Sequence, residues 1–143
     1  MSRSDQNSRT GPRIAPVVWG LFLLCLIPES VLFGADMGWW GRPEWRQIAW
    51  AYGGFWSGLL GNWRPNYPFQ ALLMFPSYGF IHASPAHFLL NMTTLLSVAP
   101  PIVDRIGQGR FLVLYLVSLI GGAVGFVLLS NVIAPMVGAS GAL

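Results

Sequence analysis

The sequence predicts an all-α membrane protein with about three transmembrane helices and the start of a fourth. Three observations support this prediction: the composition, three long apolar runs, and a Trp-rich segment between the first two runs. Hydrophobic residues make up 54% of the 143 residues and charged residues only 9%, whereas a soluble domain carries about 25% charged residues. The eight arginines give a net charge of +3 and are scattered along the chain, so nucleic-acid binding is not expected.

The first 35 residues divide into a polar tail and a first span. Residues 1–13 are polar and lack apolar periodicity, which predicts a mobile N-terminal tail. Residues 14–35 are apolar except for Glu29, and a run of this length crosses roughly 30 Å of hydrocarbon. A signal peptide is the alternative, but its apolar run is usually only about 7–15 residues long. We therefore expect an uncleaved helix, with Pro28 and Glu29 near its far end, where water or other helices satisfy them.

A Trp-rich segment follows, in which charged residues are mixed with six of the seven tryptophans. Indole rings prefer the headgroup level of a bilayer. We therefore expect a membrane-associated first loop over residues 36–84, with helical stretches such as residues 44–60. An aromatic belt that anchors the loop and a gate for a substrate are both compatible with this pattern.

The second span is expected at residues 85–99. The chain has no charged residue from Pro65 to Val103, but five prolines divide this run, so it cannot form one smooth helix. Ser84 is a good N-cap and Pro85 suits the first helical position. The helix is expected to end at the Pro100-Pro101 pair.

Residues 104–110 then predict a short polar turn, because they combine three charged side chains with two glycines. The apolar run that follows predicts a third helix over about residues 109–130. Residues 131–138 are expected to form a loop, and a fourth helix is expected to begin near Ala139.

Arginine placement predicts a cytoplasmic N-terminus. Three arginines lie in the tail, two in the turn at 104–110 and three in the Trp-rich segment. Two membrane crossings separate the tail from the turn, so these five arginines lie on the same side of the membrane. Positively charged residues favour the cytoplasmic side of a membrane. We therefore expect a multi-pass protein in the lipid bilayer of a bacterial inner membrane, with Ser140 toward the external side, a little below the surface.

His87 and Asn91 are the first of the polar residues that need an explanation in the apolar part. They are four residues apart on the helix that begins after Ser84, so their side chains share one face within one turn. A neutral imidazole and a carboxamide each offer an N–H donor, and two donors aimed at one point stabilise an oxygen that becomes negative. The alternative is that they hydrogen-bond another helix or a water molecule, as polar groups in membrane helices often do.

Ser140 lies in the tetrapeptide G-A-S-G, between Gly138 and Gly141. These glycines allow close backbone approach and leave the hydroxyl unobstructed. At a helix start, free backbone N–H groups and the positive end of the dipole lie beside the serine oxygen, which suits an attacking serine whose product is an oxyanion. Packing is the other interpretation, because small residues also let membrane helices approach closely.

The sequence offers only two histidines, and a serine nucleophile needs a base, usually a histidine, within hydrogen-bond reach. His82 precedes the second helix, where it can hydrogen-bond the loop, and a purely structural role is its alternative. His87 is better placed as a donor. The residues therefore predict no complete Ser-His dyad.

Taken together, the motifs resemble the rhomboid family of intramembrane serine proteases. The features that resemble this family are His82 with the H-x-x-x-N pair, the charged turn V-D-R-I-G-Q-G-R, a glycine-bearing third helix and then G-A-S-G, in this order. The resemblance covers residues 14–143, which correspond to about the first half of a rhomboid core. It implies a compact six-helix bundle whose first loop lies partly in the membrane.

The resemblance also implies the roles of individual residues. Ser140 would be the nucleophile, and His87, Asn91 and the backbone N–H of Ser140 would form the oxyanion hole. Gly138 and Gly141 would support the site, and His82 would support the first loop and an internal water pocket. Either Trp45-Arg46 or Trp63-Arg64 would match the Trp-Arg pair of the family. The implied substrates are transmembrane proteins, and neither a cofactor nor a metal is implied.

One element of the family pattern is absent from these residues. Rhomboids take their general base from a histidine of the sixth helix, in an Ala-His-x-x-Gly-type motif that this sequence does not contain. We therefore expect the chain to be the N-terminal portion of a longer protease and to be inactive alone.

Two other functions fit part of the sequence. One is a non-catalytic rhomboid-like protein that binds membrane helices, which the missing base favours and Ser140 disfavours. The other is a fragment of a channel or transporter in which G-A-S-G separates two half-helices. A second interrupted helix would be expected in that case, and none is evident in the sequence.

Overall fold

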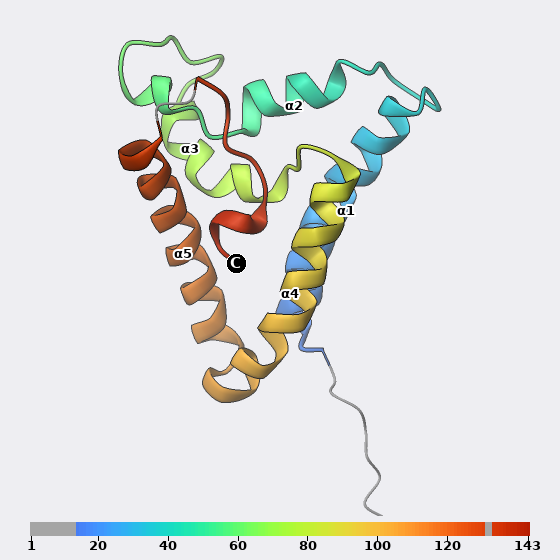
Figure 1. Cartoon of the computed structure of the whole chain (residues 1–143), viewed down its shortest axis with the longest axis vertical. Helices are drawn as coiled ribbons and strands as arrows, with labels where there is room; N and C mark the ends of the chain where they lie inside the picture. Colours follow the sequence, from blue (N-terminus) through green and yellow to red (C-terminus); the bar gives the residue numbers. More distant parts are fainter. Residues whose placement is uncertain (1–13, 131–132) are drawn as a thin grey trace, which may run out of the picture.

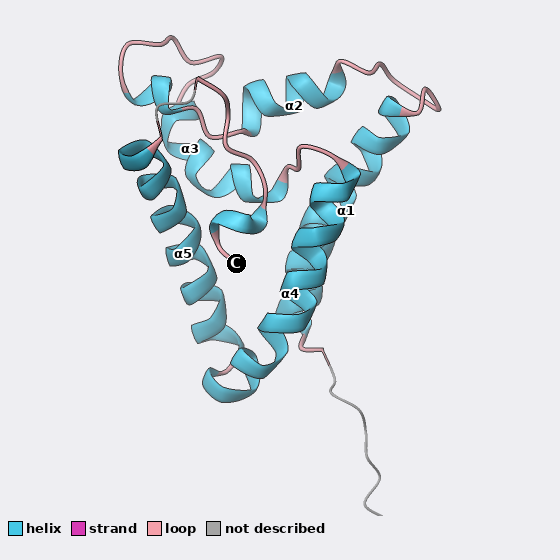
Figure 2. Ribbon diagram, viewed as in Figure 1, coloured by secondary structure: helices cyan, strands magenta, loops and turns pink. Residues whose placement is uncertain are grey.

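The computed structural model describes residues 14–130 and 133–143 (Figure 1). The predicted tail at residues 1–13 and the first two residues of the predicted 131–138 loop lie outside the described residues. The described residues form five α-helices and three short 3₁₀ turns, and Figure 2 shows no strand among them, which confirms the all-α prediction. The helices are α1 (Pro16–Asp36), α2 (Trp45–Gly53), α3 (Gln70–Ser77), α4 (Pro85–Ile106) and α5 (Gln108–Leu129), and the turns are η1 (Ser57–Leu60), η2 (Tyr78–Phe80) and η3 (Ala139–Gly141).

Three of these helices, α1, α4 and α5, are long and apolar enough to cross a membrane. Their lengths of 21, 22 and 22 residues match the roughly 20 residues that a bilayer requires. Large apolar side chains of these helices, such as Leu24, Leu90 and Leu129, are exposed. A membrane protein exposes such side chains to lipid at little cost, so this chain is a helical membrane protein.

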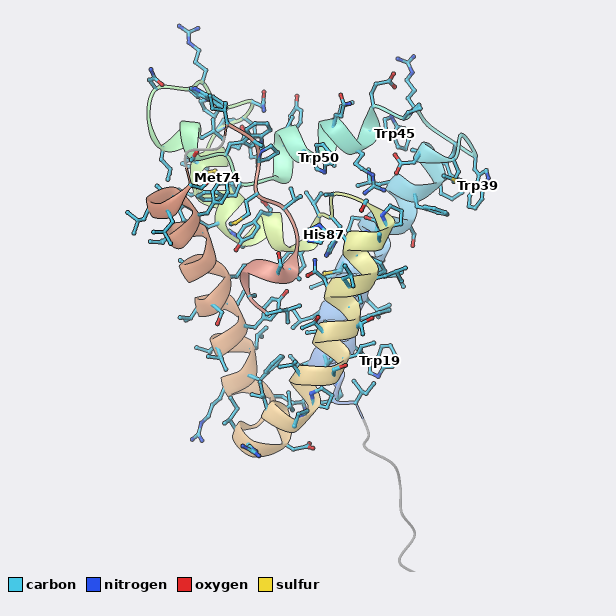
Figure 3. All side chains as sticks on the ribbon, in the orientation of Figure 1. Trp19, Trp39, Trp45, Trp50, Met74 and His87 are labelled. Carbon is cyan, nitrogen blue, oxygen red and sulfur yellow. The ribbon has the colours of Figure 1, made fainter. Side chains whose placement is uncertain are left out.

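The three spans form a V (Figure 1). Helices α1 and α4 lie side by side and share one buried cluster, in which Val18 and Cys25 of α1 pack with Phe88 and Leu95 of α4. Helix α5 diverges from this pair, and η3 lies between the two arms. Helices α2 and α3 cross the wide end of the V, where Trp39, Trp45 and Trp50 also lie (Figure 3).

The start of α1 and the junction of α4 with α5 lie at the opposite, narrow end of the V (Figure 1). A hydrogen bond joins them, in which the backbone N–H of Val17 donates to Oε1 of Gln108 at 3.1 Å. Arg105 and Arg110, on either side of the junction, therefore lie at the end of the bundle from which α1 begins. The Trp-rich segment lies at the other end.

Helix α4 continues through Pro100 and Pro101 to Ile106, so the predicted stop at this pair is wrong. In lipid, backbone N–H and C=O groups that leave a helix have no hydrogen-bond partner. A membrane helix therefore continues through prolines that would end a helix in water. Burial also holds this stretch in place, because Val103 packs in the cluster shared with α1.

The predicted polar turn at residues 104–110 is present but much shorter than expected, because both helices extend into it. Gly107 alone separates the two helices. It has a φ of +81°, which glycine adopts readily, and it caps α4 by donating to the carbonyl of Val103 at 2.8 Å.

The predicted loop at residues 36–84 contains two α-helices that the sequence did not separate. The expected helical stretch at 44–60 ends at Gly53, because the chain then turns extended and Phe55 forms an antiparallel bridge with Met136. The two backbone hydrogen bonds of this bridge are each 2.9 Å long. Helix α3 begins at the fully buried Gln70, whose Nε2 donates to the carbonyl of Ala51 at 2.7 Å.

The expected fourth helix appears only as a single turn in the described residues. The 3₁₀ turn η3 begins at Ala139, where the helix was predicted to begin, and spans three residues. Such a turn has no helix dipole of its own, so the dipole argument for Ser140 does not apply to this structure.

Candidate functional site

The first turn of α4 holds His87 in place. Ser84 has extended backbone angles and caps the helix, because its Oγ accepts a hydrogen bond from the backbone N–H of His87 at 3.2 Å. Pro85 occupies the first helical position, where its missing N–H costs nothing. The sequence therefore defines where this helix begins, and His87 lies on its first turn.

The imidazole of His87 has a defined direction. Its Nδ1 accepts a hydrogen bond from the backbone N–H of Ala83 at 3.4 Å. When Nδ1 is an acceptor in a neutral imidazole, the proton is on Nε2. The Cε1–Nε2 edge of the ring lies close to Gly138, because a Cβ built on that glycine would lie 2.5 Å from Cε1 and 2.8 Å from Nε2. His87 therefore presents an N–H donor to the G-A-S-G turn.

Asn91 presents a second donor to the same place. Its side chain is buried, and its Nδ2 would lie 3.0 Å from a Cβ on Gly138. Among the residues that the structure describes, Nδ2 has no hydrogen-bond partner. A buried amide without a partner is costly, so such a group in a native structure needs an explanation, and a catalytic role is one of them. The H-x-x-x-N pair thus converges on Gly138.

The G-A-S-G turn is fixed from its other sides by Tyr78 and α5. The backbone N–H of Gly138 donates to the carbonyl of Tyr78 at 2.9 Å. The Tyr78 hydroxyl donates to the carbonyl of Leu119 in α5 at 2.6 Å and lies against Gly141. Gly141 in turn lies against Gly122 of α5. A Cβ at Gly141 would collide with Tyr78, and a Cβ at Gly138 would collide with His87, so the turn requires both glycines.

Ser140 is the exposed residue of this turn. Gly138 and Ala139 are buried before it, and Gly141 is partly buried after it. The turn places Ser140 two residues from the point where His87 and Asn91 converge. Figure 3 shows His87 toward the wide end of the V.

His82 is fully buried beside this pair. Its ring lies edge-on to the rings of His87 and Phe88, with centroids 5.5 Å and 5.4 Å away. Neither ring nitrogen has a hydrogen-bond partner in the described part of the chain. Burial, with smaller electrostatic contributions from His87 and Arg46, lowers the pKa of His82 to about 4. The imidazole is therefore neutral at physiological pH.

The two candidate Trp-Arg pairs have different environments in the structure. Arg64 is exposed, whereas Arg46 is only 7% exposed and forms ion pairs with Glu29 and Asp36. The sequence predicted that Glu29 needs a partner but did not identify Arg46. It also missed Tyr78, and a tyrosine beside glycine in an apolar run was the only signal.

The comparison with protein families now bears on this geometry. The family model described as the rhomboid domain matches residues 70–143, which include α3, α4, α5 and the G-A-S-G turn. The chain belongs to the rhomboid family. Members of this family are generally intramembrane proteases, and the matched part of this rhomboid contains His82, His87, Asn91 and Ser140. No curated protein matches the chain.

Proposed function

We propose that this rhomboid is an intramembrane serine endopeptidase that cleaves peptide bonds in or near the transmembrane helices of membrane proteins. The single observation that best supports the proposal is the convergence of His87 Nε2 and Asn91 Nδ2 on Gly138, two residues before Ser140. In this assignment Ser140 is the nucleophile. His87, Asn91 and the backbone N–H of Ser140 form the oxyanion hole.

The proposed reaction begins when Oγ of Ser140 attacks the carbonyl carbon of a peptide bond. The carbonyl oxygen becomes negative, and the N–H groups of His87 and Asn91 donate hydrogen bonds to it. The C–N bond then breaks, the amine leaves with a proton, and an acyl-enzyme remains on Ser140. Water hydrolyses this ester and restores the serine. The scheme uses no metal or cofactor.

The proton of the Ser140 hydroxyl needs an acceptor, and the proposal assigns that role to neither histidine of this sequence. His87 is used as a donor through Nε2, and His82 is buried with its Nδ1 and Nε2 away from water. The family resemblance gives the role to a histidine of a sixth helix. Activity is therefore proposed for a protein that supplies this histidine, and these 143 residues alone are proposed to be inactive.

The proposed substrates are transmembrane proteins with helix-destabilising residues near the cleaved bond. A regular helix engages its carbonyl groups in hydrogen bonds, so local unwinding exposes the bond to Ser140. The proposed location is a bacterial inner membrane, with the N-terminus in the cytoplasm. Arg105 and Arg110 support this orientation, because they lie at the end of the bundle from which α1 begins.

Cleavage of a transmembrane substrate by the full-length protein in lipid vesicles tests the proposal. The wild-type protein and Ser57→Ala, a matched change in η1, are expected to cleave it, whereas Ser140→Ala is expected to be inactive. Equal cleavage by Ser140→Ala would exclude Ser140 as the nucleophile. Stable binding of the substrate without cleavage by the wild type would instead favour the non-catalytic alternative.

A further inference from the structure

A buried charge cluster joins the far end of α1 to the first turn of α2. Nη1 and Nη2 of Arg46 donate to the two carboxylate oxygens of Glu29 at 3.0 and 2.9 Å. Nε donates to Oδ2 of Asp36 at 2.7 Å. Glu29 and Arg46 are only 5% and 7% exposed. Two carboxylates thus fix the plane of one guanidinium, which is the geometry that arginine recognises best.

The same guanidinium reaches beyond the cluster to the segment that precedes α4. Nη1 of Arg46 also donates to the backbone carbonyl of His82 at 2.9 Å, and Nε1 of Trp50 donates to this carbonyl at 3.4 Å. All three guanidinium nitrogens are therefore engaged, and one of their acceptors is a single peptide group two residues before the N-cap of α4.

That peptide group is the one that binds His87. The carbonyl of His82 and the N–H of Ala83 belong to the same rigid amide plane. The carbonyl side accepts from Arg46, and the N–H side donates to Nδ1 of His87 at 3.4 Å. A hydrogen bond from a cation to the carbonyl polarises the amide and strengthens the donation from its N–H. The cluster and the imidazole are thus joined through one peptide bond.

We propose that Arg46, held by Glu29 and Asp36, is a positioning residue that orients the His82–Ala83 peptide and thereby keeps the proton of His87 on Nε2. With this peptide fixed, Nδ1 meets an N–H and must be the acceptor, so the ring presents Nε2–H toward Gly138. A rotated peptide would turn its carbonyl toward Nδ1 and favour the opposite tautomer. Nε2 would then carry a lone pair, which repels a developing oxyanion. The catalytic consequence rests on the proposed function.

No other group around the His87 ring sets its tautomer in the described part of the chain. The ring contacts Gly138, which offers no polar side chain, and lies edge-on to the neutral ring of His82. In the part of the chain that the structure describes, the His87 ring accepts a hydrogen bond from Ala83 and forms no other. The tautomer therefore depends on the orientation of one peptide.

The test compares Arg46→Lys with Arg64→Lys. Both arginines follow a tryptophan, but Arg64 is exposed and makes no ion pair among the described residues, so it is the matched control. Lysine keeps the charge at position 46 but cannot bind both carboxylates and the carbonyl in one plane. Should this variant fail to fold, Glu29→Gln weakens the same cluster without leaving an unpaired arginine.

The first readout is the ¹⁵N spectrum of the His87 imidazole in the full-length protein, with histidines labelled and assigned through His87→Gln. We expect a protonated Nε2 in the wild type and in Arg64→Lys, and a mixture of both tautomers in Arg46→Lys or Glu29→Gln. An unchanged His87 spectrum in a folded variant at position 46 or 29 would overturn the proposal. This readout requires no activity, so it is separate from the test of the proposed function.

The second readout is the kinetics of substrate cleavage. We expect Arg46→Lys to lower kcat by about tenfold or more with little change in KM. This loss should not exceed the loss of about 10²–10³-fold that follows removal of a whole oxyanion donor. In a His87→Gln background the same substitution should have almost no further effect, because it acts through that ring. Independent, additive losses would contradict the positioning role. If the tautomer shifts but neither the wild type nor any variant cleaves peptide, the proposed function is wrong, whereas the role of Arg46 in setting the tautomer is supported.

Discussion

Replacing Gly138 by alanine tests whether the G-A-S-G turn must pack directly on the donor pair. Gly138 has φ and ψ of 105° and 154°, and forcing a residue with a Cβ into such a region costs on the order of 1–3 kcal/mol. The added Cβ would also lie 2.5 Å from Cε1 of His87 and 3.0 Å from Nδ2 of Asn91. The ring and the amide are both fixed on α4, so the turn must move away from them.

The expected result is a large loss of reactivity at Ser140. Because removal of one oxyanion donor costs about 10²–10³-fold, we expect Gly138→Ala to slow labelling by a fluorophosphonate by at least about 100-fold. The midpoint of thermal unfolding in detergent should also fall. Gly125→Ala is the matched control, because Gly125 lies in α5 and a Cβ there would meet no described atom within 4 Å. Wild-type labelling and stability in Gly138→Ala would refute this reasoning.

Three further predictions concern the framework of the site. The pKa of His82 lies below its ordinary value of 6.5, at about 4, so the unfolded state binds more protons between these pH values; stability should have its full value above about pH 6.5 and fall by about 3 kcal/mol toward pH 4, and denaturant titrations should show this added pH dependence in the wild type and not in His82→Gln. Tyr78→Phe removes the hydrogen bond to Leu119 and should lower the free energy of unfolding by about 1 kcal/mol with little effect on labelling of Ser140; a loss of labelling at unchanged stability would contradict this. Ser84→Ala should cost about 1 kcal/mol and speed amide exchange at His87, and unchanged exchange there would show that the cap is dispensable.

The spans could be predicted from the sequence because their signal is strong and local. Long apolar runs without charge have few alternatives in a membrane, and Ser84 with Pro85 is a local signal for a helix start. The ends were harder to predict. The Pro100-Pro101 pair predicts a stop by its local chemistry, but the helix continues because lipid offers no partner to an open backbone and because Val103 is buried in the core cluster that α4 shares with α1 and α5.

The candidate site was predicted in part for a similar reason. The four-residue spacing of His87 and Asn91 follows from helix geometry, and the structure brings both side chains to Gly138. Contacts across long stretches of sequence were not predictable. The ion pair of Glu29 with Arg46 spans 17 residues, and the bond of Tyr78 to Leu119 spans 41. No periodicity in the sequence indicates which arginine or tyrosine is near.

The most direct test of the account is to map the residue that a fluorophosphonate modifies in the full-length protein. Mass spectrometry of the labelled protein is expected to find the phosphonate on Ser140. Labelling should persist in Ser57→Ala, disappear in Ser140→Ala and slow strongly in His87→Gln. Modification of another serine, or labelling that survives in Ser140→Ala, would contradict the claim that Ser140 is a nucleophile served by the donors of His87 and Asn91.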